Sequence, residues 1–509
     1  MNKQNKTFYI TTPLYYVNSH PHLGHSYSTI VADIINRYKK LFNFQTYFLT
    51  GTDEHGQKIV EAAKKDGKSP EKFVDKISEE FQRMWPKLDI EYSQFIRTTN
   101  DSHKRIVQNI LQKVYDKGEI YFAEYEGLYC VGCERFLDER ELVDGNCPDH
   151  GTKPTLIKES NYFFKMSKYQ DWLIDYINKH NEFIFPDQYR KEILSFLKEP
   201  LKDLCISRPK DRLDWGIELP FDKKYVTYVW FDALINYISA LGYPDGNLFK
   251  EYWKYAHHII GKDILKAHAV YWPTMLKAIG LEPMRKLAVH GYWNNKSMKM
   301  SKSIGNVVNP LELVNIFGVD GLRFLLISEM VFGKDADFRL DSFTTSYNAH
   351  LANNFGNLVS RVINFTIKNF DGRVPECMEL TELEHVLQEK VRKKVDSIKK
   401  ALDSFQIHEI ARNFLEISAL TNQYFDKTEP WKLAKNEGQR DRLGSILYTC
   451  CDIIRIMNIF ISPVMPNISL KLAKYLGYDS VKTEEMDLNL LPSGQLMYKP
   501  ESLFPRIEQ

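Results

Sequence analysis

The stretch Phe8–Tyr16, FYITTPLYY, together with the residues that follow it, decides the expected fold. Its aromatic and β-branched residues are typical of a buried strand. After a turn at residues 18–21 a helix is expected, with an apolar face at helical spacing made of Ile30, Val31, Ile34, Ile35, Tyr38 and Leu41. A second strand at Tyr47–Leu49 and a second helix after residues 51–56 repeat the alternation. The pattern predicts an α/β fold with a doubly wound, Rossmann-like parallel sheet, whose ligands gather at the carboxyl ends of the strands.

Further along the chain the alternation is interrupted and then resumes. Residues 118–225 contain a cysteine cluster, many aromatic residues and few strand–helix repeats, which indicates an insert. Further strands are expected at Tyr225–Trp230, His257–Gly261 and Leu287–Val289. Beyond about residue 345, apolar residues at steps of three and four predict a helix bundle, as in Leu387, Val391, Val395, Ile398, Leu402, Phe405 and again in Ile446, Cys450, Ile453, Met457, Phe460.

These patterns predict five segments. Residues 1–117 and 226–290 form the two halves of the Rossmann-like catalytic domain, and residues 118–225 form the connective insert. Residues 291–345 hold a lysine-rich loop and a connecting domain, and residues 346–509 form an all-α domain.

Composition sets limits on the class of protein. The 509 residues are 43% hydrophobic and 26% charged, as in globular rather than disordered or fibrous proteins. The net charge is only +2, so a nucleic-acid partner would have to meet local basic patches. Neither a signal-peptide core nor an apolar stretch of the roughly 18 residues needed to span a bilayer is expected, and a cytoplasmic location is predicted.

The motif His22-Leu23-Gly24-His25 stands where the first strand ends and the first helix is expected to begin. Free backbone N–H groups and the helix dipole favour phosphate at such a place. Gly24 would allow a flat base or ribose to approach the backbone. The alternative is a pair of surface histidines in a turn.

The loop Lys299-Met300-Ser301-Lys302-Ser303 complements that motif. Its two lysines suit the spreading negative charge of departing pyrophosphate. Alone, the stretch could be a solvated basic loop. Together with the histidines it predicts one nucleotide site assembled from two distant segments, suited to activating a carboxylate as an adenylate.

Three of the seven cysteines cluster with a histidine at the spacing of a metal site. Cys130 and Cys133 form one pair, and Cys147 and His150 form the other. Three thiolates and one imidazole fill the four positions of a tetrahedral zinc and leave none open, so the predicted zinc is single and structural. Buried free thiols are the alternative, and they are the expectation for the other four cysteines.

The paired motifs resemble those of class I aminoacyl-tRNA synthetases, and their surroundings resemble the methionyl-tRNA synthetase family over almost the whole chain. The resemblance rests on residues 12–18 (TPLYYVN), 51–56 (GTDEHG), 230–233 (WFDA) and 261–264 (GKDI), besides the two motifs. It implies an AMP-forming methionine–tRNA ligase that converts L-methionine and Mg-ATP to methionyl-adenylate. It further implies transfer of the methionyl group to the 3'-terminal adenosine of tRNA(Met), including initiator tRNA.

The resemblance also implies roles for individual residues. Asp53 would bind the α-ammonium group of methionine, and the remaining methionine-binding residues would be Pro13, Leu14, Tyr16, Trp230, Ala233, Tyr237, Ile264 and His268. The ATP-binding residues would be His22, Gly24, His25, Asp263 and Lys302, with catalysis by His22, His25, Lys299 and Lys302. By spacing alone, Trp230 and Tyr237 could be ordinary core residues, and Asp263 a helix N-cap.

In the helical part, the resemblance implies that Asn357, Arg361 and Trp431 contact the anticodon. An amide, a guanidinium and an indole can read and stack unpaired bases. A solvent-facing arginine and a packed tryptophan are the alternatives. Two rival functions also stay open, namely a class I synthetase for another amino acid and a catalytically idle tRNA-binding protein. A monomer is expected, because the chain ends at Gln509 without an added dimerisation domain.

Overall fold

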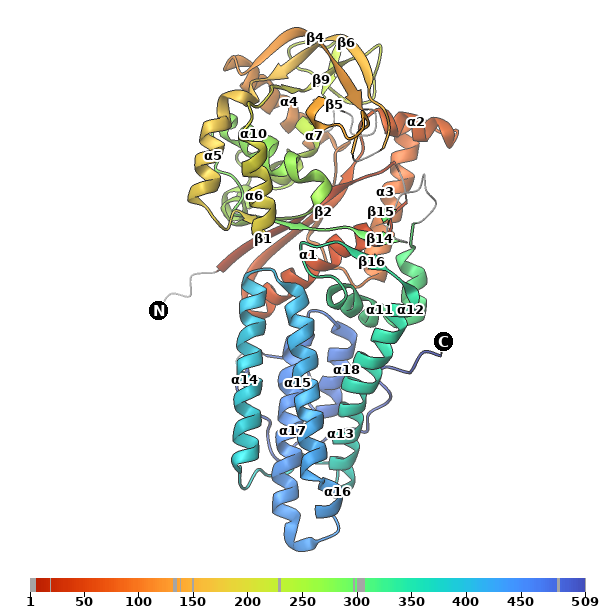
Figure 1. The fold of residues 1–509 in the computed structure, drawn as a ribbon, viewed down its shortest axis with the longest axis vertical. Coiled ribbons are helices and arrows are strands. Elements are labelled where there is room, and N and C mark those ends of the chain that lie inside the picture. Colours follow the sequence, from red (N-terminus) through yellow and green to blue (C-terminus); the bar gives the residue numbers. More distant parts are fainter. Residues whose placement is uncertain are drawn as a thin grey trace. The chain divides into compact units, whose positions relative to one another are not determined.

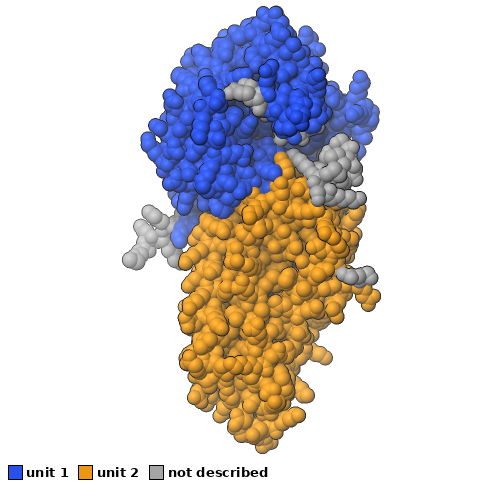
Figure 2. Space-filling view, in the orientation of Figure 1, with its two compact units in different colours: residues 1–21, 44–86, 90–291 blue, residues 22–43, 87–89, 292–509 orange. Residues whose placement is uncertain are grey.

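The structure, a computed structural model, describes residues 6–18, 20–130, 135–137, 139–148, 151–227, 230–295, 298–299, 307–482 and 486–508. The chain divides into two compact units, which Figure 2 shows in different colours. We call residues 1–21, 44–86 and 90–291 the sheet unit, and residues 22–43, 87–89 and 292–509 the helical unit. The predicted segment boundaries stay predictions.

A six-stranded parallel sheet lies at the centre of the sheet unit, with the order β3-β2-β1-β12-β13-β7. The strands are β1 (Lys6–Tyr16), β2 (Phe44–Asp53), β3 (Gln94–Arg97), β7 (Ile184–Phe185), β12 (Ala256–Gly261) and β13 (Lys286–His290). Side chains that are fully buried come from several of these strands, among them Tyr9, Ile10, Ile259, Ile260, Leu287 and Val289. Such apolar strands are typical of a parallel sheet covered on both faces. The expected α/β parallel sheet is confirmed.

The helices of the sheet unit follow or connect these strands in the chain. They are α2 (Gln57–Lys65), α3 (Pro70–Lys87, whose last residue falls in the helical unit), α4 (Asp101–Asp116), α5 (Gln170–Lys179), α6 (Asp187–Phe196), α7 (Trp230–Ala233), α8 (Asn236–Ser239), α9 (Asn247–Tyr252) and α10 (Trp272–Ile279). Most of the buried residues of α4, α8 and α10 share one apolar cluster with those of the sheet.

The expected insert contains an antiparallel sheet of its own, with the order β5-β4-β6-β8. Its strands are β4 (Ile120–Cys130), β5 (Arg135–Leu137), β6 (Thr155–Phe164) and β8 (Leu204–Cys205). The long ladder between β4 and β6 runs from Ile120↔Phe164 to Tyr129↔Thr155. The insert also supplies β7 to the edge of the main sheet, which the sequence did not predict.

The prediction that Tyr225–Trp230 forms a strand of the parallel sheet is wrong. Strand β11 (Tyr225–Thr227) pairs antiparallel with β9 (Ser207–Pro209) and β10 (Ile217–Glu218), and Trp230 begins helix α7. A short aromatic run indicates a strand but does not reveal its partners, because pairing depends on residues distant in the chain.

The helical unit consists mainly of helices, and those beyond residue 345 form the predicted bundle. They are α1 (Leu23–Leu41), α11 (Pro310–Ser328), α12 (Leu340–Ser346), α13 (Asn357–Asn369), α14 (Glu382–Asp403), α15 (Ile407–Thr428), α16 (Pro430–Leu433), α17 (Arg440–Ile461) and α18 (Pro466–Leu476). The unit also holds a small sheet of β14 (Trp293–Asn295), β15 (Met298–Lys299) and β16 (Ala336–Phe338). Figure 1 shows α13, α14, α15 and α17 side by side, and contacts join α17 to α13, α14, α15 and α18.

The core helix of this bundle corrects one expectation. The segment Glu437–Ile461 is 25 residues long with a mean hydropathy of 1.4 in its most apolar window, which is enough to span a bilayer by length and composition. The sequence was expected to lack such a stretch. All of that window is buried inside the protein, as in the central helix of a bundle.

Candidate active site

The ends of β1 and β2 bring Leu14, Tyr16 and Asp53 together. In the parallel register Leu14 pairs with Gly51 and Tyr16 pairs with Asp53, after a bulge between Thr11 and Leu14 that contains the buried Pro13. Side chains of paired residues lie on the same face of a sheet. The Asp53 side chain is only 6% exposed, so the end of β2 presents a nearly buried carboxylate.

A buried ion pair next to Asp53 fixes this end of β2. Glu54 is fully buried, and its carboxylate accepts hydrogen bonds from Arg97 Nε at 2.7 Å and Arg97 Nη2 at 3.0 Å. The Trp215 indole donates to the Glu54 carbonyl oxygen at 2.6 Å. A two-pronged arginine bond of this kind is strong and geometrically specific. No sequence signal identifies Glu54 as a positioning residue, because its partners come from distant segments.

Tyr237, His268 and Ile264 form one hydrogen-bonded chain. The His268 ring lies with Nδ1 3.0 Å from the Ile264 carbonyl oxygen, so Nδ1 carries the proton and donates it. Nε2 is then an acceptor, and the Tyr237 hydroxyl donates to it at 2.7 Å. Burial lowers the pKa of His268 to about 4, which keeps the ring neutral. The hydrogen-bonded pair of Tyr237 and His268 is therefore uncharged.

We expect the His268 ring to stay neutral from pH 8 to pH 5.5, with no titration of its ring signals in NMR spectra. Since the unfolded chain takes up this proton below about pH 6.5, the contribution of His268 to the free energy of unfolding is present above that pH. It is lost at about 1.4 kcal/mol per pH unit as the pH falls toward the folded-state pKa of about 4. A titration of His268 with a midpoint near pH 6.5 in the folded protein would contradict this prediction.

A buried carboxylate flanked by two histidines lies directly beside the predicted methionine-binding residues. Asp232, between Trp230 and Ala233 on α7, accepts hydrogen bonds from His55 Nδ1 at 2.7 Å and His103 Nε2 at 2.8 Å. Burial opposes ionisation of Asp232, but the two imidazoles hold the pKa of its carboxyl below the usual value. Because His55 follows Asp53 by two residues, Asp232 ties the Asp53 loop to the helix that carries Trp230. No motif in the sequence predicts this network, because its three members are far apart in the chain.

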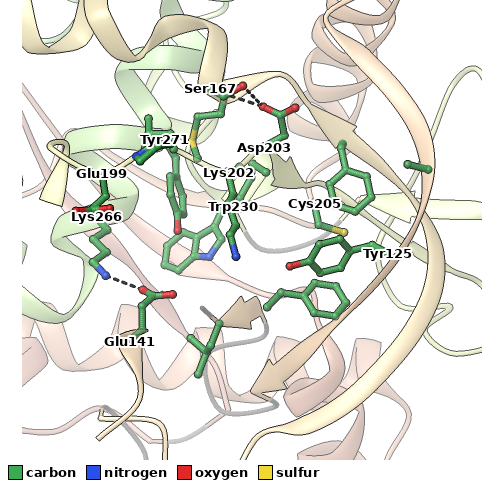
Figure 3. A pocket seen from close by; sticks show the side chains of 18 of the residues that line it. Tyr125, Glu141, Ser167, Glu199, Lys202, Asp203, Cys205, Trp230, Lys266 and Tyr271 are labelled. Carbon is green, nitrogen blue, oxygen red and sulfur yellow. Dashed lines mark hydrogen bonds and ion pairs between the residues drawn. The ribbon is translucent and has the colours of Figure 1, made fainter. Parts of the chain in front are cut away.

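A cavity of about 660 Å³ adjoins Trp230. Figure 3 shows Trp230 beside Tyr271, and the two rings meet edge to face at 6.3 Å. Residues of the insert also line the cavity, among them Glu141, whose carboxylate pairs with Lys266 at 2.6 Å. Trp230 is half-buried and lines this space, whereas Tyr237 and Ala233 are buried. Trp230 also packs against the main apolar cluster of the sheet unit, so its role in binding methionine stays a prediction.

The predicted nucleotide-binding histidines lie at the start of α1, in the helical unit. Their rings stack with centroids 3.6 Å apart. The Gly24 N–H donates to His22 Nδ1 at 3.1 Å, and the His22 N–H donates to His25 Nδ1 at 3.3 Å. With each Nδ1 an acceptor of a backbone N–H group, each neutral ring carries its proton on Nε2. A Cβ atom at Gly24 would lie only 3.0 Å from the His22 ring, so glycine permits this arrangement.

The other predicted nucleotide-binding residues are placed only in part. Asp263 is exposed within a short 3₁₀ helix, Lys262–Ile264, and its Oδ1 would lie 2.7 Å from a Cβ added at Gly261. It belongs to the sheet unit, whereas the histidines belong to the helical unit. The backbone of Lys299 pairs with Asn294 in the β14–β15 hairpin. Lys302 lies outside the described residues.

Two of the four predicted zinc ligands come together. Cys130 and Cys147 are each 1% exposed and share a small cluster with Leu137. Cys133 and His150 lie outside the described residues. Within the part of the chain that the structure describes, no group of three possible metal-binding side chains occurs. Of the four cysteines expected in the core, Cys450 and Cys451 are fully buried, while Cys205 and Cys377 are partly exposed.

Two of the three predicted anticodon-binding residues are linked through one aromatic ring. Asn357 is exposed at the start of α13, and Arg361 follows one turn later. The Arg361 guanidinium lies 5.0 Å from the Phe425 ring centroid and pairs with Asp426 at 2.6 Å. Phe425 in turn lies 6.4 Å from the ring of Trp431, which is 39% exposed. Phe425 thus joins Arg361 to Trp431, a link that the sequence did not predict.

Comparison with known families matches both parts of the chain. A family model described as class I tRNA synthetases (M) matches residues 8–154 and 149–363. A second, described as the anticodon binding domain of methionyl tRNA ligase, matches residues 374–509. Among curated relatives, the methionine–tRNA ligase of Caldanaerobacter subterraneus is 44% identical over 99% of this chain and 79% of its own length. That of Clostridium perfringens is 43% identical over 99% of this chain and 78% of its own length.

Solved structures agree with the sequence comparison. A Mycobacterium tuberculosis methionyl-tRNA synthetase in complex with methionyl-adenylate superposes with a TM-score of 0.94 and 37% identity, covering 98% of this chain and all of the other (100%). The free form from the same organism superposes with a TM-score of 0.88 and 34% identity, covering 100% of both chains. The chain therefore belongs to the methionyl-tRNA synthetase family of class I tRNA synthetases.

Proposed function

We propose that this chain activates L-methionine with ATP and transfers the methionyl group to the 3'-terminal adenosine of tRNA(Met). The observation that carries the proposal is that Tyr16 and the nearly buried Asp53 are paired at the ends of β1 and β2. The uncharged Tyr237–His268 pair belongs to the same unit. A carboxylate beside an apolar, aromatic pocket suits an amino acid with an ammonium group and a thioether side chain.

In the first step, a carboxylate oxygen of methionine attacks the α-phosphorus of ATP. A new P–O bond forms while the bond to the β-phosphate oxygen breaks, giving methionyl-adenylate and pyrophosphate. Asp53 holds the ammonium group, and Leu14, Tyr16 and Trp230 contact the side chain. The Nε2–H groups of His22 and His25 donate to phosphate oxygens, and Lys299 and Lys302 stabilise the charge on the departing pyrophosphate. Mg²⁺ enters with ATP and neutralises part of the phosphate charge.

In the second step, a hydroxyl of the terminal adenosine attacks the methionyl carbonyl carbon, and AMP leaves. No side chain has to form a covalent bond to the substrate in either step. The protein therefore acts by positioning and by electrostatic stabilisation.

Recognition of tRNA is tested by charging with labelled methionine. We expect Arg361→Ala to raise the KM for tRNA by about 5- to 150-fold, because a lost base contact costs about 1–3 kcal/mol. Methionine-dependent pyrophosphate exchange without tRNA should stay unchanged. Arg412→Ala, which removes an exposed arginine paired with Glu409 on α15, is the matched control and should leave both rates unchanged. Equal charging of tRNAs with and without a CAU anticodon by the wild-type protein would argue against the proposal.

We further propose one structural zinc held by Cys130, Cys133, Cys147 and His150. The support is the shared burial of Cys130 and Cys147 within the small insert. Bound zinc would fix the fold of a segment with little core of its own. Elemental analysis of the purified protein should find about one equivalent, and Cys147→Ser should lose it, whereas Cys205→Ser should keep it. Less than about half an equivalent in the wild-type protein would count against the site.

A further inference from the structure

A fully buried arginine joins the helix that carries His22 and His25 to the core of the helical bundle. Arg323, on α11, has 0% exposure, and its guanidinium has five hydrogen-bond partners. Nε donates to the Val464 carbonyl at 2.8 Å. Nη1 donates to the carbonyl oxygens of Leu88 and Asp89, each at 3.1 Å. Nη2 donates to the Pro463 carbonyl at 2.9 Å and to the Asp33 carboxylate at 2.6 Å. Every N–H group that arginine offers is thus used.

The acceptors come from three separate segments, all within the helical unit. Asp33 lies on α1, about 16 Å along the helix axis from His22 and about 12 Å from His25. Leu88 and Asp89 follow α3, and Pro463 and Val464 connect α17 to α18. Because four of the five acceptors are backbone carbonyls, Arg323 fixes the path of the chain itself and not merely one side chain.

Neighbouring contacts strengthen the same junction. Asp33 also accepts from Arg37 Nε at 2.8 Å, and Arg37 Nη2 donates to the Asp89 carbonyl at 2.7 Å. The Tyr38 hydroxyl, in the last part of α1, donates to the Phe460 carbonyl near the end of α17. Helix α1 is therefore attached to the bundle at two levels by polar groups that water does not reach.

A buried ion pair is a poor source of net stability, because the cost of removing both charges from water offsets their attraction. The hydrogen bonds of Arg323 are nevertheless geometrically specific. An arginine with five fixed acceptors permits only one arrangement of the segments that carry them.

We propose that Arg323 is a positioning residue of the adenylation step, which holds α1 so that His22 and His25 meet the phosphates correctly. The inference rests on the proposed function of those two histidines. Arg323 touches no substrate and acts through Asp33 and helix α1. A displacement of a catalytic group by about 1 Å can lower a rate by about 100-fold. The methionine-binding residues belong to the sheet unit, so methionine affinity should not depend on Arg323.

The test compares Arg323→Lys with Arg455→Lys in the full-length protein. Arg455 is a suitable control because it is also buried in the helical unit, pairs with Asp452 at 2.8 Å and donates to the Asp487 carbonyl at 2.6 Å, all away from α1. Arg323→Lys should lower kcat for methionine-dependent pyrophosphate exchange by about 10- to 100-fold. The Kd for methionine, measured by tryptophan fluorescence, should change less than about twofold. Arg455→Lys should leave kcat near the wild-type value, even where both variants lower the melting temperature equally.

A second variant decides the question if Arg323→Lys fails to fold. Asp33→Asn keeps the shape of the side chain and all four carbonyl contacts of Arg323, and it weakens only the attachment of α1. It should lower kcat while the Kd for methionine stays unchanged. Helical content measured by circular dichroism, which the helical unit dominates, checks that the variant is folded. A wild-type kcat for folded Asp33→Asn, or equal losses in Arg323→Lys and Arg455→Lys, would overturn the positioning role. If pyrophosphate exchange is absent in the wild-type protein, the proposed function fails instead.

Discussion

Replacement of Asp53 with asparagine is expected to lower kcat/KM for methionine by about 100- to 1,000-fold in pyrophosphate exchange. The carboxylate is only 6% exposed, so it meets the ammonium group largely shielded from water. Loss of one partner of such a buried charge pair costs about 2–5 kcal/mol. Asparagine has nearly the same shape, so the neighbouring Glu54–Arg97 pair and the fold should be retained.

The control for Asp53→Asn is Asp263→Asn, in the same unit. Asp263 is exposed and is predicted to bind the ribose of ATP. Asp263→Asn should therefore raise the KM for ATP and leave that for methionine unchanged, while Asp53→Asn should do the reverse. An unchanged KM for methionine in Asp53→Asn would remove the proposed role of this carboxylate.

Replacement of Lys302 with alanine is expected to lower kcat for pyrophosphate exchange by about 100-fold or more, with little effect on the KM for methionine. A charge that acts mainly on departing pyrophosphate stabilises the transition state more than the ground state, so its loss appears in kcat. Stopped-flow measurement of adenylate formation checks the step directly.

The control for Lys302→Ala is Lys334→Ala, since Lys334 is an exposed lysine of the helical unit outside the motif. Its removal should leave kcat unchanged. Activity retained in Lys302→Ala would contradict the mechanism, although the fold and family would stand.

Much of the fold followed from local patterns. The run from Phe8 to Tyr16 and the apolar face of the next helix correspond to β1 and α1. Local patterns failed where partners are distant. Strand β11 joins a separate antiparallel sheet, and the two-residue strand β7 extends the main sheet from within the insert. Nothing in a short apolar run specifies which strand it will meet.

The residues of the candidate site also fall into two groups, those that local patterns predict and those that they do not. Asp53 and Tyr16 could be expected together, because the ends of neighbouring parallel strands meet at one edge of a sheet. The hydrogen bonds of Asp232 to His55 and His103 could not, since they join residues 177 and 129 positions apart. The five hydrogen bonds that Arg323 donates could not be predicted either, because four of the acceptors are backbone carbonyls, which have no sequence signature.

The central claim is that the pocket of the sheet unit selects methionine. Pyrophosphate exchange measured separately with each of the twenty amino acids tests it most directly. We predict exchange above background with methionine, and at least 100-fold lower kcat/KM with leucine or cysteine, whose side chains differ from methionine in length or polarity. Exchange stimulated by leucine or cysteine but not by methionine would contradict the account.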